Sequence, residues 1–238
     1  MALDLAPASY PSRRCEVLWM LGLFLFLAFV FRFFPEIDLW AASQFYAPEH
    51  GFFSPDNWWL AIPYFGMPIL AQLMVWGILL GWLAAWRLPK FKAWRMVFAF
   101  WFCAALLGPH LLVGEVLKDH VGRARPSDVQ QFGGSLIFTP AFVVSDQCDK
   151  NCSFVSAHVA SAAFVMAFGW LSAPAVRRRW LWAGVGFAAV LGLARMAQGG
   201  HFLSDVIFPV FAVYAGLWTS EWLFSWRGWL PMPNVPKR

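Results

Sequence analysis

The sequence predicts an all-α, polytopic membrane protein whose six transmembrane helices form one bundle and one domain over residues 1–238. Of the 238 residues, 60% are hydrophobic, 19% are aromatic and only 13% are charged. Charged residues make up about a quarter of a soluble globular domain, so this chain has too few to cover a surface that faces water. The composition also excludes a disordered chain, and four Cys residues are too few for a soluble disulfide scaffold.

Six apolar runs carry this prediction, because each approaches the roughly 20 helical residues that cross a bilayer. The first has a competing interpretation as a cleaved signal peptide, since the small residues 41–43 resemble a cleavage site. It is longer than the roughly 7–15 apolar residues of a signal peptide, so we favour a membrane span. The six runs are Val17–Phe34, Met67–Trp86, Met96–Leu117, Val155–Leu171, Trp180–Ala197 and Phe202–Phe224.

The segment Pro35–Pro63, between the first two runs, mixes aromatic rings with polar residues. Amphipathic rings of this kind lie at headgroup level, so the segment favours a helix or loop in the outer membrane interface. A simple connector is the alternative interpretation.

Lys and Arg gather on one side of the six-span topology. Two precede the first run, four separate the second and third, three separate the fourth and fifth, and three follow the sixth, which together make 12 of the 18 basic residues. The positive-inside rule predicts that this side is the cytoplasm and that both termini lie there. The net charge of +5 comes from these small clusters rather than from a basic stripe, which argues against nucleic-acid binding.

Ionisable residues in the last two runs are functional candidates, because a charged side chain costs about 2.5–3.5 kcal/mol at the bilayer centre on insertion scales. Arg195, His201 and Asp205 lie near the outer end of these runs. The spacing of His201 and Asp205 predicts that both lie on one helix face, with Asp205 accepting the Nδ1 hydrogen of the imidazole. Nε2 of His201 would then be free as a nucleophile or base. A buried pair without a chemical role is the alternative.

Two further segments bring cations and N–H donors to the same outer side. Run three ends in the basic stretch 118–126, where topology requires no cations. Run four opens with Ser156, Ala157 and His158, and a helix N-terminus presents free backbone N–H groups. Converging cations and N–H donors suit a phosphate dianion, and the His and Asp residues suit covalent transfer with proton transfer.

These segments resemble the motifs of the type-2 phosphatidic acid phosphatase superfamily. Its first motif, Lys, six residues, Arg-Pro, is matched in full by Lys118, Arg125 and Pro126. Its second motif, Pro-Ser-Gly-His, keeps Ser and His here, but Val155 and Ala157 replace Pro and Gly. Ala157 still has a backbone N–H, so the anion site can survive the replacement.

The third motif of that superfamily is Ser-Arg, five residues, His, three residues, Asp. Arg195, His201 and Asp205 match it, while Ala194 replaces Ser. The motifs cover Lys118–Asp205, and the six-span layout extends the resemblance over most of the chain.

The resemblance implies a role for each matched residue. His201 attacks phosphorus and forms a phosphohistidine, and Asp205 orients and charges His201. His158 protonates the leaving oxygen and then activates the water that releases phosphate. The phosphate oxygens are held by Lys118, Arg125, Arg195, Ser156 and the N–H of Ala157.

Arg123 is close enough in sequence to join these cations, the alternative being a surface arginine on a loop. Because the cations do the work that Mg²⁺ does in kinases, we expect no metal ion or other cofactor.

Cys148 and Cys152 lie four residues apart in the polar loop before the second motif. In an oxidising compartment such a pair forms a disulfide, which we favour over two free thiols. Without a nearby His they make a poor zinc site.

We therefore expect an integral-membrane lipid phosphomonoesterase of a bacterial inner membrane, with its active site facing the periplasm. The loop 132–140 and the Cys148–Cys152 stretch are most similar to lipid A phosphatases. Phosphatidylglycerophosphate, phosphatidate or undecaprenyl pyrophosphate hydrolysis, a lipid phosphotransferase and a non-catalytic lipid-phosphate binding protein are the alternatives. The expected partners are the phosphorylated lipid and the membrane lipids, with no nucleic acid and no obligate protein partner.

Overall fold

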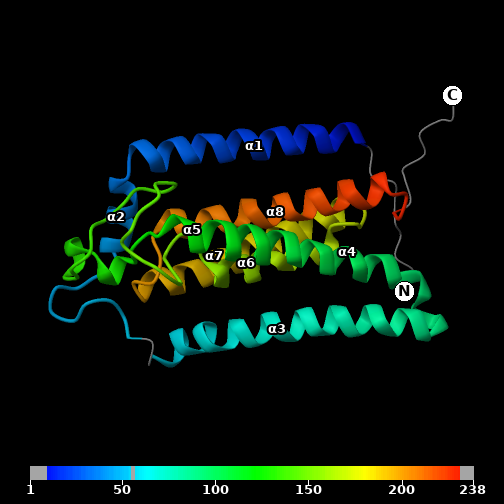
Figure 1. Ribbon diagram of the computed structural model, residues 1–238, viewed down its shortest axis with the longest axis horizontal. Coiled ribbons are helices and arrows are strands. Elements are labelled where there is room, and N and C mark those ends of the chain that lie inside the picture. The colour runs from blue at the N-terminus through cyan, green and yellow to red at the C-terminus, as the bar shows by residue number, and fades with distance from the viewer. Residues whose placement is uncertain (1–9, 55–56, 231–238) are drawn as a thin grey trace.

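The computed structural model describes residues 10–54 and 57–230, which form helices and loops without a β-strand. Figure 1 shows the long helices running along one common axis, in one bundle. The predicted all-α class is confirmed.

Five helices are long and apolar enough to cross a membrane. The helix that begins at Pro89 is continuous, although its turns change from 3-10 (η1, Pro89–Trp94) through α (α4, Arg95–Ala105) to π (η2, Leu106–Lys118). The other four are α1 (Tyr10–Phe33), α3 (Trp58–Arg87), α7 (Pro174–Ala197) and α8 (Leu203–Trp226).

The fourth predicted span is shorter than we expected from the sequence. Instead of Val155–Leu171, the apolar helix covers Ala157–Gly169, as α6 (Ala157–Ala163) and the 3-10 helix η5 (Phe164–Gly169). At 1.5–2 Å per residue it is about 20–26 Å long, short of a hydrocarbon core of about 30 Å. Its residues are largely buried among the other helices, so this segment lies inside the bundle and does not itself need a full-length apolar surface.

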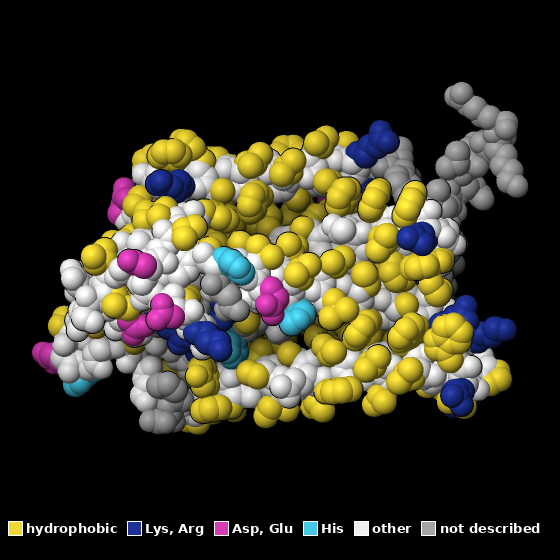
Figure 2. All heavy atoms as spheres, viewed as in Figure 1, with side chains coloured by type: hydrophobic (Ala, Val, Ile, Leu, Met, Phe, Trp, Pro, Cys, Tyr) yellow, Lys and Arg dark blue, Asp and Glu magenta, His cyan; other side chains and the backbone are white. Residues whose placement is uncertain are grey.

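The outer faces of α1 and α3 are apolar, as expected of a membrane protein. Trp19 on α1 is 79% exposed, and Trp76 and Leu80 on α3 are exposed as well. Figure 2 shows yellow apolar side chains over the middle of the molecule; Lys and Arg lie at both ends, and most Asp and Glu lie toward the end opposite the start of α1. Exposed apolar surface of this extent, on helices long enough to cross a membrane, indicates contact with lipid.

Close contact between helices holds the start of η2 against α8. A side chain on Gly216 of α8 would lie 2.6 Å from the Cα of Gly108, so only glycine allows the two backbones to approach this closely. Pro109 follows at once, and its ring nitrogen cannot donate a hydrogen bond to the preceding turn. The wide turns of η2 continue from there to Lys118.

The end of the bundle farthest from the start of α1 is covered by short elements. The predicted interfacial segment Pro35–Pro63 begins with a helix, α2 (Glu36–Ser43). Trp40 of α2 is exposed, as an interfacial ring should be, but Asp38 is completely buried. The chain between η2 and α6 adds α5 (Asp119–Val121), η3 (Pro126–Asp128), η4 (Gln130–Phe132) and a loop with a disulfide between Cys148 and Cys152.

Candidate active site

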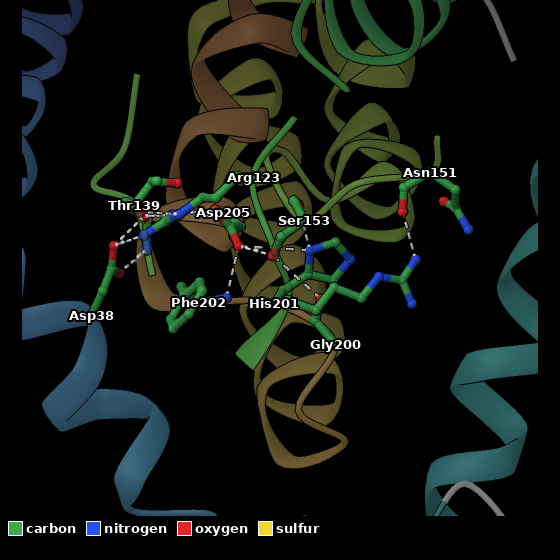
Figure 3. A network of polar contacts seen from close by, with 11 residues as sticks. Asp38, Arg123, Thr139, Asn151, Ser153, Gly200, His201, Phe202 and Asp205 are labelled. Carbon is green, nitrogen blue, oxygen red and sulfur yellow. Dashed lines mark hydrogen bonds and ion pairs between the residues drawn. The ribbon is translucent and has the colours of Figure 1, made fainter. Parts of the chain in front are cut away.

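His201 lies at the α2 end of the bundle, in the turn between α7 and α8, and is 1% exposed. Its Nδ1 is 2.7 Å from the carbonyl oxygen of Ser153, so Nδ1 carries the hydrogen and donates it. Figure 3 shows the other ring nitrogen turned away from Ser153 and Asp205. In the neutral ring this Nε2 has the lone pair that a nucleophile needs.

The pKa of His201 is well below its usual value. Burial is the main cause, and the positive charges of Arg195, Lys118 and Arg125 add to it, against the opposing effect of the Ser153 carbonyl. The same three cations interact electrostatically with His158. The structure therefore brings the matched cations and both histidines to one place, and it keeps His201 neutral there.

The predicted hydrogen bond between His201 and Asp205 is absent from the structure. Helix α8 begins at Leu203, so His201 precedes the helix and does not share a helix face with Asp205. The nearest Asp205 oxygen is 3.9 Å from Nδ1, beyond hydrogen-bonding distance.

The oxygens of Asp205 have other donors instead. Oδ2 accepts hydrogen bonds from the hydroxyl of Ser153 at 2.5 Å and from the backbone N–H of Phe202 at 2.8 Å, while Oδ1 accepts one from Arg123 at 2.6 Å. Ser153 therefore connects the two residues, because its hydroxyl bonds to Asp205 and its carbonyl holds His201. The N–H of Phe202, at the start of α8, has no acceptor within the helix. By accepting its hydrogen bond, Asp205 also caps that helix.

Arg123 is neither a surface residue nor placed to hold phosphate, contrary to both predictions. It is completely buried, and its guanidinium contacts the rings of Phe138 and Phe202, whose centroids lie 5.3 and 4.4 Å from it. Its N–H groups donate to Asp205, Asp38, the hydroxyl of Ser204 and the carbonyl of Thr139. Burial alone would lower the pKa of Arg123, but the carboxylates of Asp205 and Asp38 raise it.

Asp38 and Ser204 complete this network and were not predicted from the sequence. Asp38 accepts hydrogen bonds from Arg123 at 2.8 Å, from the Ser204 hydroxyl at 2.6 Å and from the Ser204 N–H at 2.8 Å. Figure 3 shows Asp38 pointing from α2 toward Arg123, with Asp205 on the other side of the guanidinium. No local signal in the sequence identifies Asp38; only once Arg123 is known to be buried does its need for carboxylate partners point to an acidic residue.

Arg195 is held in the last turn of α7 by several neighbours. It is 4% exposed, donates to Gln198, and lies 4.7 Å from the centroid of the Tyr64 ring. A side chain on Gly200 would lie 2.5 Å from an Arg195 nitrogen, so a larger residue there would displace the guanidinium. Nε of Arg195 is buried and has no hydrogen-bond partner within the described residues.

The remaining donors come from the ends of two other helices. Arg125 donates to the carbonyl of Asn151 at 2.8 Å. Ser156 precedes α6, and its buried hydroxyl has no hydrogen-bond partner in the described part of the chain. Ala157 is the first residue of α6, so its N–H has no acceptor within the helix. Unpaired buried donors are costly unless a ligand satisfies them, and a phosphate oxygen is a suitable acceptor.

His158 contacts a backbone carbonyl that a proline in a neighbouring helix leaves without its usual donor. Its ring stacks on Tyr64 of α3 with centroids 5.7 Å apart, and its Nε2 is 3.1 Å from the Tyr64 carbonyl oxygen. In a regular helix that carbonyl would accept the N–H of the fourth residue onward, which is Pro68 and has none. The carbonyl is thus available to accept the hydrogen of His158.

The comparisons with known proteins agree with the motifs. Residues 98–229 match the PAP2 superfamily. The chain is 39% identical over 202 residues to a lipid A 4'-phosphatase of Francisella tularensis subsp. novicida (strain U112), covering 81% of this chain and 89% of that protein. It is 42% identical to lipid A 4'-phosphatases of Rhizobium leguminosarum and Rhizobium etli, over 43% of this chain and less than half of each relative. No solved structure matches the chain. The predicted resemblance is confirmed: this chain belongs to the PAP2 superfamily and is a phosphatase.

Proposed function

We propose that this membrane phosphatase removes a phosphate monoester from lipid A through a phosphohistidine intermediate. The observation that carries the proposal is the arrangement of His201, whose Nδ1 is fixed by the Ser153 carbonyl while Arg195, Lys118 and Arg125 supply positive charge around the ring. A neutral imidazole held beside several cations is suited to attack a phosphate dianion. The similarity to lipid A 4'-phosphatases supports lipid A as the substrate.

In the first step, the lone pair on Nε2 of His201 forms a bond to phosphorus, and the bond from phosphorus to the lipid oxygen breaks. The cations and the hydroxyl of Ser156 hold the other three oxygens as negative charge redistributes. In the second step, water attacks the phosphohistidine, the N–P bond breaks, and inorganic phosphate leaves.

We assign the proton transfers to His158. The Tyr64 carbonyl keeps a hydrogen on Nε2 of this ring in both its charge states, because a carbonyl oxygen can only accept. Nδ1 is therefore the nitrogen that donates to the leaving lipid oxygen in the first step and accepts a hydrogen from water in the second.

We also propose that the site faces the periplasm and that both termini are cytoplasmic. Ten of the 12 clustered basic residues lie within the described chain, and the remaining two, Lys237 and Arg238, lie outside it. The positive-inside rule assigns the end with the clustered Lys and Arg to the cytoplasm, which leaves His201 on the periplasmic side. A reporter active only outside the cytoplasm should be active when fused after Lys150 and silent when fused after Leu88. The reverse pattern would invert the topology.

The substrate test uses detergent-purified protein and lipid A that carries both of its phosphates. Mass spectrometry should detect loss of one HPO₃ unit with release of inorganic phosphate, and tandem fragmentation should place the loss at the 4' position. His201→Ala should abolish the reaction, whereas His50→Ala, which removes an exposed histidine of the same end, should not. Release from phosphatidate or undecaprenyl pyrophosphate but not from lipid A would reassign the substrate. Transfer of phosphate to another lipid would identify a phosphotransferase, and activity in His201→Ala would refute the phosphohistidine.

A further inference from the structure

A cavity lies at the end of the bundle opposite His201, between α1, α7 and α8, where no step of the proposed reaction takes place. Its volume is about 650 Å³, within the range of cavities that hold small molecules. Its polar residues include Arg177 and Arg178 at the start of α7. Arg177 and the active-site Arg195 are 18 residues apart in this helix, or about 27 Å, so the two sites lie near opposite surfaces of the membrane.

The polar part of this cavity is a built site rather than a group of mobile surface chains. Arg177 is 7% exposed, and it donates two hydrogen bonds to Glu16 of α1 at 2.5 and 2.8 Å. The hydroxyl of Tyr214 donates to the same carboxylate at 2.7 Å, and the ring of Trp170 lies 4.1 Å from the guanidinium. Nε of Arg177 is buried and has no partner within the described residues. An anion bound beside Arg177 would give this N–H an acceptor.

The charge of the cavity lining is positive. Arg13, Arg177 and Arg178 line it together with one carboxylate, Glu16. Arg13 is paired with Glu221 and Arg177 with Glu16, whereas Arg178 is exposed and has no ion-pair partner in the part of the chain that the structure describes. An anion would be attracted here by Arg178 and would accept the N–H of Arg177.

The rest of the lining is apolar and extends toward the middle of the membrane. Leu181 and Val185 continue along α7, with Met20 of α1 and Val210 of α8 opposite. From Arg177 to Val185 the cavity follows α7 for about 12 Å. Helix α1 is little covered by the rest of the protein, since only 6% of its most apolar stretch is buried. A cationic end joined to an apolar slot between helices matches a charged headgroup joined to an acyl chain.

We propose that this cavity binds an anionic glycerophospholipid from the membrane leaflet at the end of the bundle where α1 begins. Its phosphate contacts Arg178 and Nε of Arg177, and one acyl chain lies between α1 and the pair α7–α8. Basic pockets between helices on the cytoplasmic side of a membrane bind anionic lipids by this combination of charge and apolar contact. The bound lipid fills the space beside α1 and stabilises its position against the bundle, which is independent of the reaction at His201.

The test uses the full-length protein purified in a neutral detergent. Phosphatidylglycerol and phosphatidylcholine with identical acyl chains are added separately, as is inorganic phosphate. Native mass spectrometry measures bound lipid, and thermal unfolding measures stabilisation. Phosphatidylglycerol should form the adduct and raise Tm, whereas phosphatidylcholine and inorganic phosphate should have much smaller effects.

Two variants separate this site from general charge attraction. Arg178→Gln removes the exposed guanidinium that lines the cavity, and Arg179→Gln removes its exposed neighbour, which does not line it. Arg178→Gln should weaken phosphatidylglycerol binding about fivefold, the effect of one cation near an anionic lipid, while Arg179→Gln should leave it nearly unchanged. Val185→Trp, which fills the apolar slot, should reduce the adduct in a protein with intact charges.

Equal weakening by the two arginine variants would overturn the proposal, because it would indicate only surface attraction. Equal binding of the two phospholipids would also overturn it, as would an effect of inorganic phosphate as large as that of phosphatidylglycerol. Phosphatase activity is not the readout, so a wrong substrate assignment at His201 leaves this test unaffected.

Discussion

Substitution of Asp38 by Asn tests whether the buried network behind His201 supports catalysis. Asp38, Arg123 and Asp205 are each 0% exposed, and two carboxylates share one guanidinium. Asn can still accept the N–H of Ser204, but it removes one charge partner of Arg123. Breaking a buried ion pair costs about 3–5 kcal/mol of stability. Asp205 still pairs with Arg123 and reduces this cost, so we expect the free energy of unfolding to fall by about 2–4 kcal/mol. For a chain of this length that lowers Tm by roughly 4–16 °C.

The effect on the reaction should be smaller than that of losing the nucleophile. Asp38 acts on His201 only through Arg123, Asp205 and Ser153, so kcat should fall on the order of tenfold, as with other outer partners of active-site groups. KM should change little, because Asp38 does not contact Lys118, Arg125 or Arg195, the cations proposed to bind phosphate. Phosphate release from a short-chain phosphatidate in detergent gives both constants if this soluble analogue is accepted; otherwise lipid A is used.

Glu36→Gln is the matched control, because Glu36 lies exposed on the same short helix. It should leave both Tm and kcat close to those of the unchanged protein. If Asp38→Asn were equally silent, the network would have no part in stability or catalysis, and the reasoning from burial and charge would be refuted. If it lowered Tm without changing kcat, Asp38 would be structural only.

Three further outcomes follow from the site. Burial holds the pKa of His201 below that of an unfolded histidine, which is about 6.5. Below that pH the folded state therefore binds fewer protons than the unfolded state, and the free energy of unfolding should fall on acidification by up to about 1.4 kcal/mol per pH unit. Comparing Tm at pH 7.5 and pH 5 should show a smaller loss in His201→Gln, and equal losses would contradict this. Ser153→Ala removes the hydroxyl bonded to Asp205 but keeps the carbonyl, so kcat measured by phosphate release should fall about tenfold without being abolished; an unchanged kcat would show that Asp205 does not act through this hydroxyl. Pro68→Ala supplies an N–H that competes with His158 for the Tyr64 carbonyl, so Tm should rise while kcat falls; a rise in Tm with unchanged kcat would disprove the link.

The long helices were predictable because hydropathy reports contact with lipid directly. Runs one, two, five and six all lie within the observed long helices or within a residue or two of their ends. Run four was overestimated for the same reason. Its residues are apolar because other helices bury them, and composition alone does not distinguish burial in protein from contact with lipid.

The members of the site were predictable from motif spacing, but their hydrogen bonds were not. The four-residue spacing of His201 and Asp205 indicates a shared helix face only if both lie in one helix, and Asp205 ends this possibility by capping α8 at Phe202. The counter-ion Asp38 is 85 residues before Arg123. A contact of that kind depends on how α2 folds over the end of the bundle, and no local pattern records it.

The charge distribution around His201 gives a reason for the intervening Ser153. Burial, together with the positive charges of Arg195, Lys118 and Arg125, lowers the pKa of the His201 ring, and on the proposed mechanism these cations also attract the phosphate dianion. On the Asp205 side of the ring, two carboxylates and one guanidinium form a buried group whose formal charge is −1 when both acids are ionised. On the proposed mechanism, attack on phosphorus makes the ring positive. The Ser153 carbonyl and the negative group behind it then stabilise that charge, although Asp205 makes no direct hydrogen bond to the ring. Because each oxygen of Asp205 is already bonded, this stabilisation needs little rearrangement as the ring becomes charged.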